Sequence, residues 1–313
     1  MFKKYVSIEN DYNTKTLNYL LDKYPEVRET FWVIQEKIHG SNFSIYFTNN
    51  NGDIEIKYGR RTDILADDEK FYNYQSIKEL KEIKDLIFKI IYFMKNKNIK
   101  QIIIYGELCG ANIQKEVYYY DDVRFLVFDM IIDNKWLTFE ELSRLFCDNF
   151  RLPQLLVPVI DVTLGIEKAL NIDTRFNSKV SERENNLCEG VVIKPLDKVF
   201  IYNDNPIYIK KKNREFLEKK SKRDKEIKVF DSHITEYKEI FKGYVNENRL
   251  NSVFSKYGII EDRKNIGKYI KIIYDDCLED FLKDYDLSGI SDKDKKYILS
   301  ISSDIAQLLL TKL

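Results

Sequence analysis

The chain has 313 residues, 44% of them hydrophobic and 33% charged, and its 51 basic residues balance 51 acidic ones. This length indicates about two domains of ~100–200 residues each, and the composition excludes an intrinsically disordered chain. No apolar run approaches the roughly 18 residues of a membrane helix, and the N-terminus lacks the apolar core of a signal peptide, so we expect no membrane association.

The first part of the chain is predicted to form strands and one helix. Phe31–Glu36 is apolar and β-branched, which is typical of a buried strand. Apolar and polar residues alternate on both sides of the turn-rich run 49–53, which predicts a hairpin over 43–58. Apolar residues recur at helical spacing over 75–96. A short buried strand is predicted at Ile102–Tyr105.

The next part of the chain continues with strands and a second helix. A helix is predicted over Thr138–Asn149, with Thr138 as its N-cap and Glu141 three residues later. Further strands are predicted at Phe125–Ile132, Gly190–Lys194 and Ile207–Lys211.

From about residue 229 the apolar pattern is helical to the end, and the last of the five prolines is Pro206. We therefore predict an α+β domain over 1–228 and a small all-α domain over 229–313.

Cysteine and histidine content limits the kinds of site. The cysteines show no CxxC spacing, which predicts free thiols in a reducing compartment; they are Cys109, Cys147, Cys188 and Cys277. His39 and His233 cannot build a multi-histidine metal site. A bound metal is therefore expected to be a hard cation held by carboxylates and phosphates, which favours magnesium.

The neutral net charge hides one basic segment. Residues 210–228 contain ten basic and four acidic residues, a net charge of +6 over 19 residues. Such a segment is a candidate surface for phosphate groups. A solvated linker or helix face is the alternative interpretation.

Lys37 is a candidate nucleophile. A lysine attacks only as the free amine, so its site must lower a pKa that is ordinarily near 10.4. The pattern Lys-x-x-Gly occurs at Lys37–Gly40 and again at Lys264–Gly267, so the pattern alone is weak. Lys37 follows a predicted buried strand and precedes small residues that allow close approach of a nucleotide. Lys264 lies in the helical tail and is interpreted as surface.

Other candidate residues lie on the strands that follow. Glu107 comes just after a buried strand, and Glu189 begins another. Phe128 offers an aromatic ring for stacking on a base. Lys210 and Lys212 share one face of a strand, because side chains alternate with period 2. Together with Lys37, these side chains form a plausible set for phosphoryl transfer.

Five motifs in this order resemble those of the covalent nucleotidyltransferases: Glu-Lys-Ile-His-Gly-Ser-Asn-Phe, Gly-Glu-Leu, Phe-Leu-Val-Phe-Asp, Glu-Gly-Val-Val-Ile-Lys-Pro and Ile-Lys-Lys-Lys-Asn. Within that superfamily the chain resembles the phage-type RNA ligase 2 family, whose members seal nicks in double-stranded RNA. The N-terminus and the stretch Asn248–Val253 extend the resemblance over nearly the whole chain. It implies an ATP-grasp-like domain of antiparallel sheets with helices.

The resemblance also implies three chemical steps. Lys37 attacks ATP, becomes Lys37–AMP and releases pyrophosphate. The AMP moves to the 5′-phosphate at a nick, and the adjacent 3′-OH then attacks that phosphate and releases AMP. His39 matches a family histidine that serves the later steps.

Site roles follow from the same resemblance. It places these residues around the nucleotide: Glu36, Lys37, Ile38, Asn42, Arg61, Glu107, Phe128, Glu189, Lys210 and Lys212. It implies that Phe128 stacks on adenine, that Glu107 binds the ribose, and that Lys210 and Lys212 contact the α-phosphate. Glu189 supports Mg²⁺, with Mn²⁺ as an alternative. Arg61 is preferred to Arg60 because the family's binding arginine is followed by threonine, and Arg61 directly precedes Thr62.

Two departures and two rival functions accompany this interpretation. A proline expected near Gly110 is absent, and Ser41 stands where threonine is common, but no catalytic group is lost. Residues 151–186 match poorly and receive no site.

A DNA ligase or capping-type nucleotidyltransferase is one rival, although these usually carry a strand-rich OB-fold. A non-catalytic RNA-binding protein using residues 210–228 is the other.

The expected partners are ATP and nicked double-stranded RNA, bound by a monomer. We expect a cytoplasmic protein. The composition, rich in Asn, Lys, Ile and Tyr, is typical of an AT-rich genome. If that genome is viral, the location would be the host cytoplasm.

Overall fold

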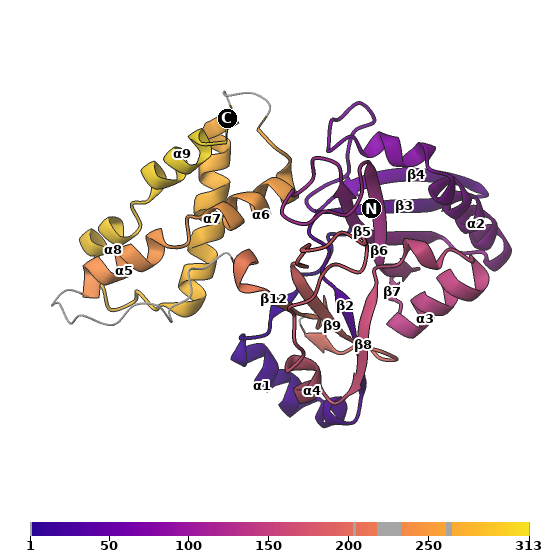
Figure 1. Ribbon diagram of the computed structural model, residues 1–313, viewed down its shortest axis with the longest axis horizontal. Helices are drawn as coiled ribbons and strands as arrows, with labels where there is room; N and C mark the ends of the chain where they lie inside the picture. Colours follow the sequence, from indigo (N-terminus) through magenta and orange to yellow (C-terminus); the bar gives the residue numbers. More distant parts are fainter. Residues whose placement is uncertain (1, 203–204, 218–232, 261–264, 313) are drawn as a thin grey trace. The chain divides into compact units, whose positions relative to one another are not determined.

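The computed structural model describes residues 2–202, 205–217, 233–260 and 265–312. The chain divides into two compact units, Met1–Asn213 and Arg214–Leu313 (Figure 1). The predicted domain boundary at 228/229, and most of the basic segment 210–228, fall outside the described residues, as does Lys264. No helix among the described residues is long and apolar enough to cross a membrane.

The first unit contains a five-stranded antiparallel sheet in the order β4-β3-β5-β6-β7. Its strands are β3 (Ser41–Asn50), β4 (Asp53–Arg60), β5 (Gln101–Gly110), β6 (Val123–Ile132) and β7 (Lys135–Trp136). The predicted hairpin is β3 and β4. Asn51 and Gly52 at its turn have φ values of 55° and 102°, which a tight primed turn requires.

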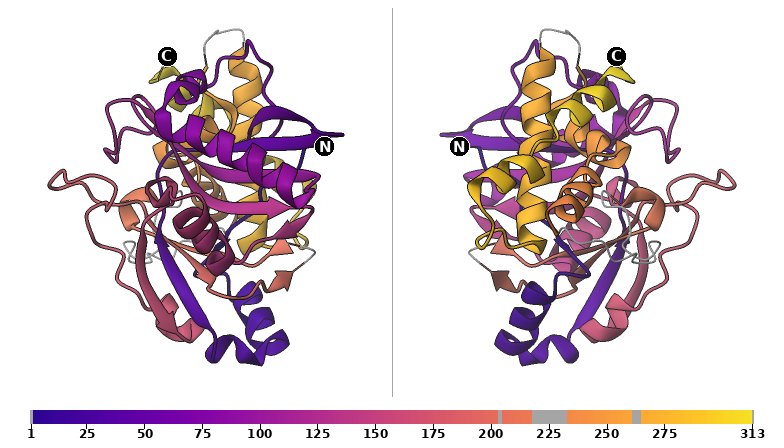
Figure 2. Two further views of the ribbon diagram at one scale, coloured as in Figure 1. Left: turned by 90° about the vertical axis from the view of Figure 1, so that its right-hand side faces the viewer. Right: turned by 90° about the vertical axis from the view of Figure 1, so that its left-hand side faces the viewer.

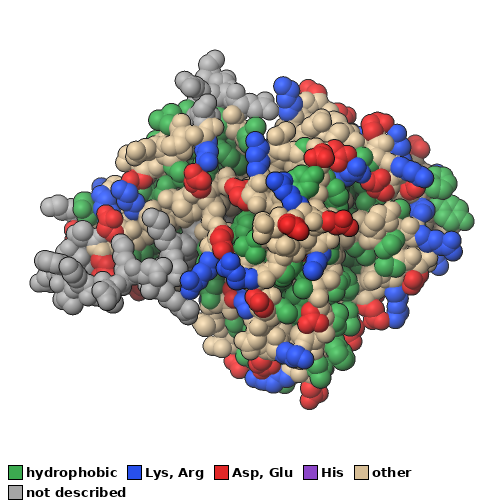
Figure 3. Space-filling view, in the orientation of Figure 1, with side chains coloured by type: hydrophobic (Ala, Val, Ile, Leu, Met, Phe, Trp, Pro, Cys, Tyr) green, Lys and Arg blue, Asp and Glu red, His purple; other side chains and the backbone are tan. Residues whose placement is uncertain are grey.

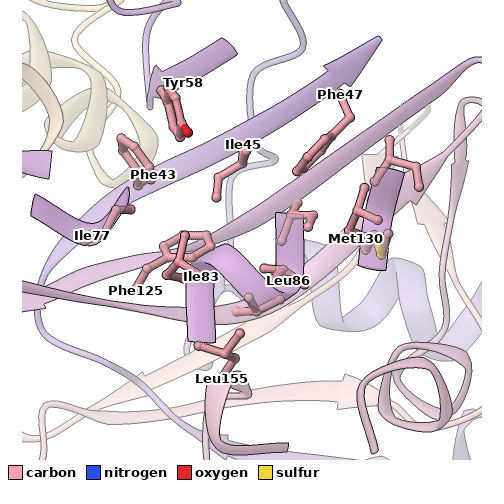
Figure 4. Close-up of a cluster of buried hydrophobic side chains, with 14 of the residues drawn as sticks. Phe43, Ile45, Phe47, Tyr58, Ile77, Ile83, Leu86, Phe125, Met130 and Leu155 are labelled. Carbon is pink, nitrogen blue, oxygen red and sulfur yellow. The ribbon is translucent and has the colours of Figure 1, made fainter. Parts of the chain in front are cut away.

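One face of this sheet is covered by α2 (Lys81–Lys97) and the 3₁₀ turn η2 (Tyr74–Glu79). The helix buries Ile83, Leu86, Ile90 and Met94, which recur at helical spacing. Figure 4 shows Ile83 and Leu86 beside Phe125 of the sheet, in the largest apolar core of the unit. The helix predicted over 75–96 is thus confirmed as a 3₁₀ turn followed by an α-helix.

A second five-stranded sheet has the order β1-β12-β9-β2-β8. Its strands are β1 (Glu9–Asn10), β2 (Phe31–Glu36), β8 (Val159–Leu164), β9 (Gly190–Pro195) and β12 (Ile209–Lys212). The short β1 pairs with β12 in parallel, and the other pairings are antiparallel. Strands β2, β9 and β12 were predicted, whereas β8 lies in the region 151–186 that matched poorly.

Helices α1 (Thr14–Lys23) and α4 (Ile166–Leu170) contribute to the core of this second sheet. Leu20 of α1 and Ile166 of α4 pack with Trp32 of β2, and Trp32 is fully buried. The remaining elements of the first unit are short; they are η1 (Pro25–Arg28), α3 (Phe139–Arg144), η3 (Leu145–Asn149), η4 (Pro153–Leu155), β10 (Ile201–Tyr202) and β11 (Asn205–Pro206).

The helix predicted over 138–149 is α-helical in its first part and π-helical in its second. Thr138 caps it: its side chain accepts from the Glu141 backbone at 3.1 Å, and the Glu141 side chain accepts from the Thr138 backbone at 2.9 Å. This capping box confirms the predicted start. The α-helix ends at Arg144, and the π-helical turn η3 continues to Asn149.

The second unit is helical throughout its described residues, as predicted. It consists of the 3₁₀ turn η5 (Arg214–Phe216) and helices α5 (His233–Lys242), α6 (Glu247–Tyr257), α7 (Ile266–Asp284), α8 (Asp292–Ile298) and α9 (Ser302–Leu310). The long α7 contacts α5, α6 and α9 (Figures 1 and 2). Its residues Ile273, Cys277 and Phe281 are fully buried in one apolar core.

Candidate active site

Strand pairing brings the distant motifs of the first unit together. Asn42 on β3 pairs with Glu107 on β5, so their side chains lie on the same face of the first sheet. In the second sheet Lys212 on β12 pairs with Gly190 on β9, next to Glu189. The segment that carries Lys37 follows β2 directly, and its backbone N–H donates to the Gly190 carbonyl at 2.9 Å.

Two glycines make these close approaches possible. A Cβ atom on Gly40 would lie 2.1 Å from the Leu108 carbonyl oxygen and 2.8 Å from Glu107 Cγ. Gly190, with φ +149°, would place a Cβ 2.1 Å from the Lys211 carbonyl oxygen. Both distances are far shorter than van der Waals contact. Any larger residue at either position would therefore push the motif strands apart.

Three basic side chains surround the Glu189 carboxylate, whose side chain is only 3% exposed. We call this group the Glu189 cluster. Lys37 Nζ lies 2.7 Å from its Oε2, and Lys212 Nζ lies 3.0 Å from its Oε1. His39 Nδ1 lies 3.2 Å from Oε2. Burial would raise the pKa of Glu189, but attraction to the two lysines and His39 prevails and holds it well below the usual range. Glu189 is therefore a carboxylate at neutral pH.

His39 bridges this cluster to the loop between β5 and β6. Its Nε2 lies 3.2 Å from Glu116 Oε2, and its backbone N–H donates to the Tyr119 hydroxyl at 2.7 Å. Burial alone would lower the pKa of His39, but Glu189 and Glu116 outweigh it and the pKa is raised. Neither Glu116 nor Tyr119 was singled out from the sequence, because neither belongs to one of the five motifs.

Glu107 is a second carboxyl group in the same pocket. Burial raises its pKa to about 7, and the nearby Glu189 adds to that rise, whereas Lys37, His39 and Arg61 oppose it. A group with this pKa is partly neutral at physiological pH. Glu107 and Glu189 thus have different charges in one pocket.

Phe128 occupies a β-bulge. Between Tyr105 and Gly106 the pairing of β5 moves from Asp129 to Val127 of β6, so Phe128 is the extra residue on its strand. A bulge redirects a side chain and is frequent beside functional sites. The Phe128 ring lies 4.9 Å from the ring of Tyr5, and Lys194 Nζ is 5.4 Å from its centre.

A buried polar network supports this bulge. Lys194 Nζ donates to Asp129 Oδ2 at 2.7 Å and to the Phe128 carbonyl at 2.9 Å. Tyr5 also donates to Asp129, and Tyr208 contacts the same carboxylate. Burial raises the pKa of Asp129, and Lys194 counteracts part of that rise. Asp129 and Lys194 stand inside the quoted motifs, so their positions were available from sequence, but their pairing was not.

The three lysines of β12 alternate as predicted. Lys212 faces Glu189, whereas the Lys211 Nζ donates to the backbone carbonyls of Leu170 and Ile172 at 2.9 and 2.8 Å. Lys210 is two residues before Lys212 and therefore shares its face. The end of β12 is fixed by Asn213, whose backbone N–H donates to the Glu189 carbonyl at 2.9 Å.

Glu36 and Ile38 flank Lys37 and are buried, at 1% and 4% exposure. Glu36 Oε2 accepts a hydrogen bond of 2.7 Å from the Lys179 backbone. Its other oxygen, Oε1, is buried without a hydrogen-bond partner among the described residues. A buried acceptor without a donor is costly, so this oxygen is a candidate contact for a bound ligand.

The structure separates the two neighbouring arginines. Arg60 pairs with Asp63 at 2.8 Å and with Glu69 at 2.7 Å. The charge of Arg61 instead acts on Glu107 and Tyr5. The choice of Arg61 as the nucleotide- or phosphate-binding arginine stays a prediction.

A metal ion would find few protein ligands here. No group of three or more His, Cys, Asp or Glu side chains in the described part of the chain could hold one. Glu189 is the buried carboxyl group here that is held fully ionised, whereas Glu107 is partly neutral. Such a site suits a hard cation that takes its remaining ligands from substrate phosphates and water, as Mg²⁺ commonly does.

Both units of the chain resemble known proteins. Residues 30–212 match a family model described as RNA ligase, and residues 229–307 match one described as T4 RNA ligase 2 C-terminal. The mitochondrial RNA-editing ligase 2 of Trypanosoma brucei brucei is 25% identical over 93% of this chain and 85% of its own length. The mitochondrial RNA-editing ligase 1 of the same organism is 23% identical over 82% of this chain and 71% of its own length.

Among solved structures, a mutant of Naegleria gruberi RNA ligase with ATP and Mn resembles this chain with a TM-score of 0.51 and 20% identity. The match covers 70% of this chain and 58% of that chain. At this identity the likeness shows a common fold of antiparallel sheets and helices.

Proposed function

This chain belongs to the RNA ligase family, and we propose that it joins RNA 3′-OH and 5′-phosphate ends at nicks in double-stranded RNA through a covalent Lys37–AMP intermediate. The observation that carries the proposal is the cluster of Lys37, His39 and Lys212 around Glu189. Glu116 offsets the charge of His39 and Glu107 is partly neutral, so Lys37 and Lys212 leave an excess of positive charge over Glu189. That excess is suited to a triphosphate.

Lys37 is the nucleophile of the first step. Its Nζ forms a bond to the α-phosphorus of ATP, and the bond to pyrophosphate breaks. The amine attacks in its neutral form, so its proton passes to water before the bond to phosphorus forms. Lys210 and Lys212 neutralise the phosphoryl oxygens as charge develops.

The rest of the nucleotide is held by groups around Lys37. Phe128 stacks its ring on the adenine, and its position in the β-bulge sets the direction of its side chain. Glu107 and its cross-strand neighbour Asn42 bind the ribose side. The buried Glu36 Oε1 accepts a hydrogen bond from the nucleotide. Ile38 forms an apolar part of the wall, and Arg61 contacts a phosphate group.

Glu189 would hold the divalent cation. Mg²⁺, or Mn²⁺ in its place, supplies charge neutralisation on the phosphate oxygens when bound. Lys37 and Glu189 are in contact before ATP binds. When Lys37 joins the AMP phosphorus it loses its positive charge, so Glu189 becomes available to other cationic partners.

In the second step the bond between Lys37 and AMP breaks as the RNA 5′-phosphate attacks. In the third step the 3′-OH attacks that phosphate and AMP leaves. A duplex-RNA ligase is expected to recognise shape and 2′-OH groups near the nick. Acidic and basic side chains are interspersed on the visible face of the first unit (Figure 3). On this face the mixed charges favour local RNA contacts over one large basic surface.

We further propose that the protein acts as a monomer. A cytoplasmic location stays a prediction, because both trypanosome relatives are named as mitochondrial. The wholly helical described part of the second unit, and its match to a T4 RNA ligase 2 C-terminal model, disfavour the strand-rich OB-fold of the DNA ligase rival.

Nick sealing tests the proposal. A duplex with an end-labelled nick is incubated with ATP and Mg²⁺, and sealed product is measured for all-RNA nicks and for nicks with deoxynucleotides at the 3′-OH side. The all-RNA nick should be sealed faster. Equal rates would contradict recognition of RNA at the nick, and no sealing of either substrate would contradict the ligase function.

A further inference from the structure

Both nitrogen atoms of the His39 ring contact a carboxylate. Nδ1 lies 3.2 Å from Glu189 Oε2, and Nε2 lies 3.2 Å from Glu116 Oε2. The backbone N–H of His39 also donates to the Tyr119 hydroxyl at 2.7 Å. With its side chain 13% exposed, the ring sits at the edge of the pocket. Two contacts on opposite sides fix the plane of the imidazole, whereas one contact would leave the ring free to turn.

The loop that carries Glu116 is itself well anchored. Val117 and Tyr119 are buried, at 3% and 2% exposure. Tyr118 donates its backbone N–H to Asn186 Oδ1 at 2.8 Å, and its carbonyl accepts from Asn186 Nδ2 at 2.6 Å. An exposed ion pair ordinarily gains little because both side chains must be ordered. The Glu116 side chain is 42% exposed, but the three residues that follow it are anchored, so less entropy is lost in this contact.

The need for this contact differs between steps. In the free enzyme Glu189 is approached by Lys37, Lys212 and His39. Once Lys37 carries AMP, its nitrogen is bonded to phosphorus and no longer provides a cation to Glu189. Because the resemblance assigns His39 to the later steps, the orientation of its ring matters after Lys37 carries AMP, and both Glu189 and Glu116 hold it then.

We propose that Glu116 is a positioning residue that holds the His39 ring through Nε2 for the RNA steps that follow formation of Lys37–AMP. The inference rests on the proposed ligase function, because it assigns a role within that reaction. Glu116 touches neither the nucleotide nor the reacting atoms in this account. It acts through its contact with His39.

The test separates the first step from the second. Formation of Lys37–AMP from labelled ATP is measured for wild type, Glu116→Ala, Glu116→Gln and Glu182→Ala. Transfer of the label from each purified adduct to a nicked RNA duplex is then measured in a single turnover. Glu182 is an exposed carboxylate on the adjacent loop and serves as the matched control.

Glu116→Ala should form the adduct at the wild-type rate and transfer AMP roughly tenfold to a hundredfold more slowly, the size expected for a lost hydrogen bond to a charged group. Glu116→Gln keeps an oxygen that accepts from Nε2 and should stay within about threefold of wild type. Glu182→Ala should be unchanged. Transfer by Glu116→Ala at the wild-type rate, loss of its adduct formation, or failure of Gln to rescue would each overturn the proposal.

A double-mutant comparison tests whether Glu116 acts through His39. Adding Glu116→Ala to His39→Ala should slow transfer no further, because the ring that Glu116 positions is already absent. A further slowing of the same size as in the single variant would show an independent structural effect and would overturn the proposal. Failure of the ligase function itself gives a different result, since wild type would then form no adduct at all.

Discussion

Each unit of the molecule contains a cluster of charged groups, and the two clusters differ in net charge. The Glu189 cluster places Lys37, Lys212 and His39 around one carboxylate. The Arg249 cluster in the second unit places Arg249 and Lys256 against Asp276 and Asp280.

The Arg249 cluster is balanced and lies within the protein. Arg249 is 1% exposed, and its guanidinium contacts Asp276 and donates to Asp280 Oδ2 at 2.9 Å. Asp276 also accepts from Lys256 at 2.8 Å. Lys283 Nζ also lies 3.1 Å from Asp280 Oδ1 and 3.0 Å from Glu279 Oε1, so three positive and three negative groups make a neutral set that joins α6 to α7. We therefore interpret it as structural, although basic residues in an RNA ligase are often assumed to face RNA.

The difference indicates what distinguishes a binding site from a structural ion pair. A structural cluster neutralises its own charge, because an uncompensated buried charge is costly. A site for an anionic ligand keeps an excess of positive charge that the ligand neutralises. The first cluster should therefore affect chemistry when it is changed, and the second should affect stability.

The largest effect is expected at Glu189. Glu189→Gln removes the charge that organises Lys37, Lys212 and His39, while keeping the shape of the side chain. Adduct formation should fall a hundredfold to a thousandfold, about 3–4 kcal/mol of transition-state stabilisation. The rate of label incorporation from ATP measures this, with circular dichroism as the folding control. A variant that forms the adduct within threefold of wild type would contradict the central role of this cluster.

The second effect is expected at Arg249 and concerns stability. Arg249→Met leaves Asp276 and Asp280 without their arginine and should lower the free energy of unfolding by about 3 kcal/mol. Denaturant unfolding of the full chain measures this. Lys256→Met, at a site 29% exposed, should cost less than about 1 kcal/mol. Adduct formation should be unchanged in both variants under conditions where they are folded. A loss of adduct formation in folded Arg249→Met would break the distinction between the clusters.

The third effect concerns Glu107 and pH. Its folded pKa of about 7 exceeds the ordinary 4.5. Between these pH values the native state therefore binds more protons than the unfolded state, so its contribution to stability falls as the pH rises. Glu107→Gln should remove this dependence and be about 3 kcal/mol more stable than wild type at pH 8, with little difference near pH 4.5. Unfolding curves at both pH values measure this, and a gain that is larger at low pH would refute the assignment.

The smallest effect separates the two arginines. Arg61→Ala should raise the ATP concentration needed for half-maximal adduct formation by about tenfold, or about 1.4 kcal/mol, because one phosphate contact is lost. Arg60→Ala breaks pairs with Asp63 and Glu69, and it should leave ATP use nearly unchanged. The opposite ranking would show that Arg60 is the arginine of the pocket.

Much of the fold follows from local sequence patterns. The hairpin, the capped helix at Thr138 and the strands that carry Lys37, Glu189 and Lys212 were predictable, because apolar spacing and turn residues act over a few positions. Strand β8 was missed: Val159, Val162 and Leu164 are exposed, so its sequence gives no clean alternation. A bulge in β8 itself, where Ile160 is the extra residue opposite Ile34 and Gln35 of β2, breaks the pattern further.

The residues of the site were predictable only where they stand in a sequence motif, and their contacts with one another were not. The pairing of Lys194 with Asp129 joins residues 65 positions apart, and the contact of His39 with Glu116 joins residues 77 apart. No local pattern specifies such contacts. The bulge at Phe128 likewise arises from the pairing of β5 with β6 and not from the residues of β6 alone.

The most direct test of the central claim is covalent labelling. Wild type and Lys37→Ala are pretreated with pyrophosphate to remove any bound AMP, incubated with α-labelled ATP and Mg²⁺, and separated by denaturing electrophoresis. The account predicts a label that stays on the wild-type chain and is absent from Lys37→Ala. A wild-type chain that remains unlabelled, or a Lys37→Ala chain that is labelled equally well, would contradict it.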